Sequence, residues 1–151
     1  MNAYLFPALE SSPDVLAALI SNIPEEKLDV PTHENRFTPR EVIAHLAEWE
    51  VILREERMRV PSMRSGVAVN EYDEGELAEK ANYAESDIPT QLAIFKAERE
   101  KTIALLKSLS KEQLQNTMVH PTRGVCTVLD LANNIVGHDM YHCRQLAEVT
   151  S

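Results

Sequence analysis

Apolar residues recur at intervals of three and four along most of this chain, which is the pattern of amphipathic helices. Four long segments carry the pattern, and they begin near Ser12, Thr38, Ile88 and Thr127. Glycine is scarce, with four residues, which also favours helices over sheets. The pattern predicts an all-α protein, a four-helix bundle that forms a single domain over residues 1–151.

The first helix is expected to begin at Ser12-Pro13-Asp14, because a capping residue there precedes a proline in the first helical position. It should stop before Pro24. Its apolar stripe is expected to contain Val15, Leu16, Leu19 and Ile20.

The second helix has the clearest start in the chain. Thr38 is the expected cap, Pro39 takes the first helical position, and Glu41 completes a capping box. We expect this helix to run to about Val60 and to end at Pro61.

The connection over residues 61–86 is long for a compact domain, and a short helix is expected within it around Glu74–Lys80. A connection of this length can cross the bundle. An up-down-down-up topology of the four helices is therefore as compatible with the sequence as a simple up-down topology. The third helix is expected from Ile88 to Leu109, and Ser110 should then open a short turn with Gln113 in the capping-box position. Residues 116–126 favour a loop or a small hairpin, and the fourth helix follows from Thr127.

Composition narrows the classes of partner. Of the 151 residues, 44% are hydrophobic and 26% charged, and the net charge is −9 without any cluster of Lys or Arg. Nucleic acid and anionic membranes, which both require basic surface, are therefore not expected as partners. We expect neither a signal peptide nor a membrane span. Two cysteines, Cys126 and Cys143, make no disulfide framework, so a cytoplasmic protein with free thiols is expected.

Three histidines, His45, His138 and His142, fall on the apolar stripes of their helices. Imidazoles in a bundle interior are costly unless they have partners. Because His138 and His142 are four residues apart, they face the same way and can bind one ion. Three ligands with one open position are typical of a catalytic divalent-metal site, whereas structural zinc sites close with a fourth ligand. The alternative is that the three are hydrogen-bonded core histidines without a metal.

Other polar residues near these positions are candidates for supporting roles. Gln145 can line the same face as His142, and Glu48 and Asp139 can act as hydrogen-bond partners of the ligands or as a base. For Glu48 a solvated position is the simpler interpretation, and for Asp139 solvation is also open. His33 and His120 are expected in solvated loops, with a place at the mouth of a pocket as the alternative for either.

Two segments resemble motifs of the DinB/YfiT-like superfamily. Residues 38–50 read Thr-Pro-Arg-Glu-Val-Ile-Ala-His-Leu-Ala-Glu-Trp-Glu, and residues 137–145 read Gly-His-Asp-Met-Tyr-His-Cys-Arg-Gln. The resemblance covers nearly the whole chain and implies a bundle of up-down-down-up topology with a long crossover between the second and third helices. It also implies a divalent metal ion, nickel or zinc, on His45, His138 and His142. Several members are dimers, so a homodimer is expected.

The resemblance and the histidines together favour a divalent-metal-dependent enzyme with an open site. Some family members transfer low-molecular-weight thiols or isomerise thiol-linked substrates, so a thiol transferase is one expected class. A hydrolase is the other, because a metal ion can also activate water. The expected substrate is a small molecule. The alternative is a non-catalytic protein that binds metal for stability or in a stress response.

Overall fold

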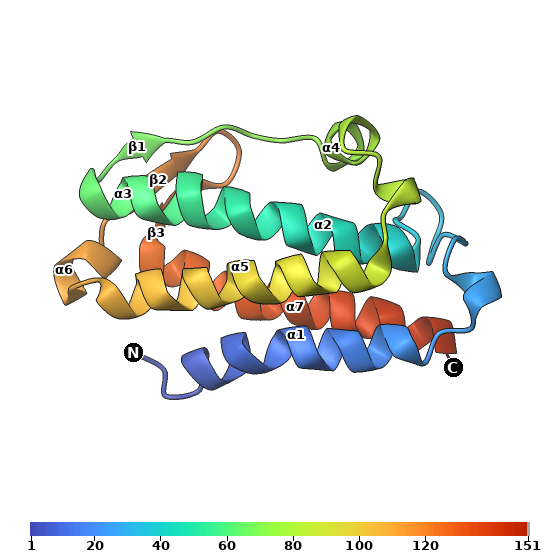
Figure 1. Cartoon of the computed structure of the whole chain (residues 1–151). Coiled ribbons are helices and arrows are strands. Elements are labelled where there is room, and N and C mark those ends of the chain that lie inside the picture. The colour runs from blue at the N-terminus through green and yellow to red at the C-terminus, as the bar shows by residue number, and fades with distance from the viewer. Residues whose placement is uncertain (151) are drawn as a thin grey trace.

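The computed structural model describes residues 1–150, and four long helices make up its bundle (Figure 1). They are α1 (Leu5–Ser21), α2 (Pro39–Ile52), α5 (Ile88–Ser108) and α7 (Val128–Thr150). In Figure 1, α1 and α7 run in one direction and α2 and α5 run in the opposite one. The predicted four-helix bundle with up-down-down-up topology is therefore confirmed. No helix within the described range is long and apolar enough to cross a membrane.

The chain between α2 and α5 returns along the whole length of the bundle (Figure 1), which lets α5 run parallel to α2. It contains the strand β1 (Val67–Ala68), the expected short helix α4 (Glu74–Lys80) and the 3-10 turn η3 (Tyr83–Glu85). β1 pairs in parallel with β2 (Thr117–His120), and β2 pairs antiparallel with β3 (Gly124–Thr127). Of the two structures expected for residues 116–126, a loop or a small hairpin, the hairpin is therefore present. The crossover adds a third strand that the sequence did not predict.

The predicted start of the first helix is wrong. α1 begins at Leu5, so Pro13 lies inside it, and the hydroxyl of Ser12 donates to the Ala8 carbonyl at 3.0 Å instead of capping. Proline has no N–H to offer the carbonyl four residues earlier, which belongs to Leu9. That free carbonyl accepts a hydrogen bond from Nη1 of Arg99 at 3.0 Å. A side chain of the bundle interior thus satisfies the backbone group that the proline leaves open.

The end of the second helix also differs from the prediction. The capping box is confirmed, since Thr38 Oγ1 accepts from the Glu41 amide at 3.2 Å and the Glu41 carboxylate accepts from the Thr38 amide at 3.0 Å. However, the chain stays helical beyond Pro61. It passes through a π-helical segment, η2 (Leu53–Arg59), into α3 (Val60–Met63). The change to i→i+5 hydrogen bonding in η2 comes just before the proline.

Short elements complete the chain. They are the 3-10 turn η1 (Glu25–Lys27) and the helix α6 (Lys111–Leu114), whose capping box of Ser110 and Gln113 matches the expected turn. Val15, expected on the buried stripe of the first helix, is instead 46% exposed. The earlier start explains this difference, because the buried residues of α1 continue a stripe that begins at Leu5. They are Leu5, Leu9, Pro13, Leu16 and Ile20.

Two apolar clusters fill the bundle, one nearer the small sheet and one nearer the opposite end. The first includes Leu9, Leu53, Ile103 and Ile135, and the second includes Leu16, Leu46, Phe95 and Leu146. Between these clusters, α2, α5 and α7 each contribute a buried charged side chain, and these are Glu50, Arg99 and Asp139. The polar layer therefore sits at mid-length in the bundle.

Candidate metal centre

The structure brings the three histidines of the predicted site together between α2 and α7. Nε2 of His138 lies 3.4 Å from Nε2 of His45 and 3.2 Å from Nε2 of His142. One ligand atom from each ring can be chosen so that all lie within 4.8 Å of one another. His45 and His142 are buried and His138 is partly buried. His45 and His138 are 93 residues apart in the sequence, and their ring nitrogens nevertheless converge on one point with that of His142.

A chain of hydrogen bonds fixes which nitrogen of His142 faces that point. Thr32 donates its hydroxyl proton to the Phe37 carbonyl at 3.1 Å, so its oxygen accepts from the Gln145 amide nitrogen at 2.7 Å. The Gln145 oxygen then accepts from Nδ1 of His142 at 2.8 Å. With the proton on Nδ1, the lone pair of Nε2 points at the other two rings.

Burial keeps the three rings neutral. Desolvation, followed by the proximity of the other two histidines, holds the pKa of His45 well below its usual range. Desolvation and the neighbouring His142 lower the pKa of His138 to about 4. Burial also lowers the pKa of His142, although the hydrogen bond that this ring donates to Gln145 and the charge of Asp139 act in the opposite direction. Neutral imidazoles are the form that binds metal ions.

Aromatic side chains enclose the cluster. The ring of Trp49 is stacked on that of His45, with centroids 6.1 Å apart and 20° between planes, and Phe37 lies 5.3 Å from His45. Tyr141 contacts His142 edge to face at 5.1 Å. Such packing limits the rotation of the histidine rings and reduces the access of water to them.

A buried ionic cluster spans α2, α5 and α7 next to the histidines, and the sequence did not predict it. The guanidinium of Arg99 on α5 binds the carboxylate of Glu50 at 2.7 and 3.1 Å and that of Asp139 at 2.8 and 3.0 Å. All three side chains are at most 3% exposed. The two carboxylates outweigh the desolvation of Arg99, so its pKa is raised above the usual arginine range. The cluster ties α2, α5 and α7 together beside the histidines.

The cluster decides the role of Asp139. It is buried and its two oxygens face Arg99, so it is neither solvated nor hydrogen-bonded to a histidine ring. The expectation that Asp139 forms a hydrogen bond with a metal-binding histidine is therefore wrong. Its negative charge still raises the pKa of His138 and His142 from a longer distance.

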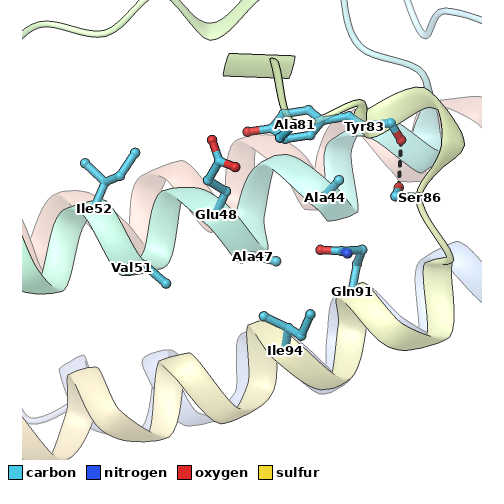
Figure 2. Close-up of a pocket in the computed structure, with 10 residues that line it drawn as sticks. All are labelled: Ala44, Ala47, Glu48, Val51, Ile52, Ala81, Tyr83, Ser86, Gln91 and Ile94. Carbon is cyan, nitrogen blue, oxygen red and sulfur yellow. Dashed lines mark hydrogen bonds between the residues drawn. The ribbon is translucent and has the colours of Figure 1, made fainter. Parts of the chain in front are cut away.

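Glu48 lies three residues after His45 but faces a different cavity, shown in Figure 2. This cavity of about 350 Å³ opens between α2 and α5, and none of the three histidines is among its lining residues. Glu48 shares it with Tyr83, whose hydroxyl is buried without a hydrogen bond of good geometry. Burial, and then the charge of Glu48, raise the pKa of Tyr83 above the usual tyrosine range. Glu48 is thus half-buried rather than fully solvated, and among residues 1–150 no hydrogen bond joins it to one of the three histidines.

The remaining candidates fall in different surroundings. His33 is exposed, as expected, and contacts Glu148 at 3.2 Å. His120 was expected in a solvated loop, but it is 5% exposed on β2, because pairing with β3 turns it into the protein. Cys143 is buried in the core, and Cys126 is half-buried on β3.

The model of the DinB superfamily matches residues 8–146 of this chain. The chain belongs to the DinB superfamily. Its relatives include the protein of Oceanobacillus iheyensis named "Putative metal-dependent hydrolase OB0782", which is 27% identical over 95% of this chain and 80% of its own length. "Putative metal-dependent hydrolase YfiT" of Bacillus subtilis is 24% identical over 94% of this chain and 80% of its own.

Solved structures of two proteins share this DinB fold. YfiT from Bacillus subtilis, described as "a probable metal-dependent hydrolase with an unusual four-helix bundle topology", superposes with a TM-score of 0.91 at 22% identity, covering 99% of this chain and 88% of YfiT. TT2238, described as a four-helix bundle protein, gives a TM-score of 0.62 at 22% identity over 94% of both chains. At these identities the likeness establishes the fold.

Proposed function

We propose that this DinB-superfamily protein is a divalent-metal-dependent enzyme whose ion is held by His45, His138 and His142. The convergence of three Nε2 atoms carries the proposal. The lone pair of His142 Nε2 points at the other two rings, and a cation at the centre can accept a lone pair from each of three neutral imidazoles. The all-imidazole donor set fits zinc and nickel, which we propose as the ion.

Three protein ligands leave a position for a substrate or water. When bound, the ion supplies Lewis-acid chemistry, which makes a water or thiol nucleophilic near neutral pH. Gln145 and Thr32 hold His142 in the tautomer that such an ion requires. The Arg99 cluster holds α2 and α7 at a fixed separation, and that separation sets the distance between His45 and the other two rings.

Two reactions fit this site, and hydrolysis is the one that the names of the relatives support. Transfer of a low-molecular-weight thiol is the second, and it rests on the family resemblance. The substrate is a small molecule in either case. We also propose that the protein acts as a homodimer in the cytoplasm, which follows from the same resemblance and from the free cysteines.

The test is an activity screen in which the metal is removed and returned. Metal-free protein should be inactive against ester and amide substrates and in conjugation of a small thiol to an electrophile, and zinc or nickel should restore one of these activities. His45→Gln should not regain it, whereas the exposed His33→Gln should behave as wild type. If chelation instead lowers thermal stability and no substrate is turned over with or without metal, the non-catalytic metal-binding alternative replaces this proposal.

A further inference from the structure

A second cavity, of about 400 Å³, lies between the small sheet and α7. Its lining includes Arg57 from η2, His120 from β2, Arg123 from the hairpin turn, and Asn134 from α7. Its volume falls within the usual range of small-molecule sites, and it combines several polar donors with apolar walls.

Arg57 is unusual among the buried arginines of the described chain. Arg54 pairs with Glu55 and Glu98, and Arg99 pairs with two carboxylates, but Arg57, at 3% exposure, has no carboxylate within 4.0 Å among residues 1–150. Nη2 of Arg57 donates to the Asn70 carbonyl at 2.8 Å, and its buried Nε has no partner. A buried charge without a counter-charge is destabilising, so an anion bound next to this guanidinium would stabilise it.

The acidic residues around Arg57 are engaged elsewhere. Glu56 accepts from the Asn70 amide at 2.8 Å and from the Tyr72 hydroxyl. Glu71 accepts from Thr122 at 3.0 Å, and Asp130, on the cavity wall, caps the Thr127 amide at 3.2 Å. Burial lowers the pKa of Arg57, and the nearby positive charge of Arg123 acts in the same direction, against the charge of Glu56.

His120 adds a neutral donor. Its Nδ1 accepts from the backbone amides of Thr122 and Arg123 at 3.2 and 3.1 Å, so that nitrogen carries no proton. The proton is therefore on Nε2, which has no hydrogen-bond partner among residues 1–150. Arg123 is exposed and likewise forms no ion pair within the described chain. Two guanidinium groups and an imidazole N–H thus line one cavity without acidic partners of their own.

One ring contact and one helix relate this cavity to the histidine cluster. The guanidinium of Arg57 lies 4.8 Å from the centre of the Trp49 ring, and Trp49 stacks on His45. On α7, Asn134 lines the cavity one helical turn before His138, which places their Cβ atoms about 6 Å apart. A π-helical segment, which is frequent at functional sites, brings Arg57 into this position.

We propose that Arg57, Arg123 and His120 bind the anionic group, a carboxylate or a phosphate, of the small molecule on which the histidine site acts. The planar fork of a guanidinium matches the two oxygens of either group. The link to catalysis rests on the proposed function, but the anion site itself is independent of the metal.

The experiment measures anion binding to the full-length, metal-free protein, dialysed after chelation so that no chelator remains. The probes are inorganic phosphate and benzoate, titrated separately, and the signal is the fluorescence of Trp49, the single tryptophan of the chain. Variants are Arg57→Gln, the exposed Arg123→Gln, and Arg64→Gln. The last removes the same charge from an exposed position outside the cavity.

Wild type and Arg64→Gln should bind at least one probe saturably, and the tighter probe identifies the group as carboxylate or phosphate. Arg57→Gln and Arg123→Gln should each weaken that binding about tenfold or more, as expected for loss of a charge-assisted hydrogen bond. Arg123→Gln keeps the test decisive if the buried substitution fails to fold. Wild type without saturable binding of either probe, or equal weakening in Arg64→Gln, would overturn the proposal, whatever the metal content of the protein.

Discussion

Replacing Arg99 with methionine should be among the most damaging single substitutions in this bundle. The change puts an unbranched apolar side chain in place of the guanidinium and leaves the carboxylates of Glu50 and Asp139 buried without their counter-charge. It also leaves the Leu9 carbonyl beside Pro13 without its partner. Removing one member of a buried ion pair typically costs about 3–5 kcal/mol. That is a large part of the roughly 5–15 kcal/mol by which a domain is stable.

Urea denaturation, followed by circular dichroism, measures this loss. With a slope of about 2 kcal/mol per molar urea, the midpoint of Arg99→Met should fall by roughly 1.5–2.5 M with the slope unchanged. Arg144→Met is the matched control, because Arg144 also pairs with a carboxylate but its side chain is 80% exposed, and it should lose less than about 0.5 kcal/mol.

A triple variant distinguishes the stability lost through unpaired buried charge from the stability lost through poorer packing. Glu50→Gln and Asp139→Asn added to Arg99→Met should recover stability, since no unpaired charge is then buried. A loss below about 1 kcal/mol for Arg99→Met alone would refute the reasoning, because the cluster would then contribute no more than a surface pair.

Two further predictions concern the histidines. In the metal-free protein the pKa of His138 is lowered to about 4, so between pH 6.5 and 4 the unfolded chain binds more protons and stability should fall as the pH falls through this window. Urea denaturation across the window should give a shallower dependence for His138→Gln, and identical slopes would contradict the burial of that ring. Gln145→Leu should weaken metal binding about 10–100-fold in a chelator competition, because His142 loses the bond that orients it. The exposed Gln115→Leu is its control, and an unchanged affinity of Gln145→Leu would remove Gln145 from the site.

Local signals in the sequence predicted much of this fold. The capping boxes of Thr38 and Ser110, and the bounds of α4, depend on residues within one turn of each other, so a pattern read along the chain can find them. The same locality explains the error at α1. Ser12-Pro13-Asp14 has the form of a helix start, and only the distant Arg99 satisfies the carbonyl that Pro13 leaves free within a longer helix.

The interior polar residues were predicted unevenly. The histidines were found because imidazoles on an apolar stripe are conspicuous, yet Arg99, between Phe95 and Thr102 on the stripe of α5, carries the same signal and was overlooked. Its partner Glu50 follows Leu46 by four residues and could have been found in the same way. His120 and Arg57 were out of reach, because strand pairing and a π-helical segment place them, and neither has a local signature in the sequence.

The central claim is that His45, His138 and His142 form one metal site. The direct test is elemental analysis of protein purified without a metal-affinity tag and then equilibrated with zinc or nickel, for wild type, His45→Gln and His33→Gln. Wild type and His33→Gln should hold one ion per chain, and His45→Gln should hold only traces while remaining folded. Wild type without metal, or His45→Gln with a full ion, would contradict the claim.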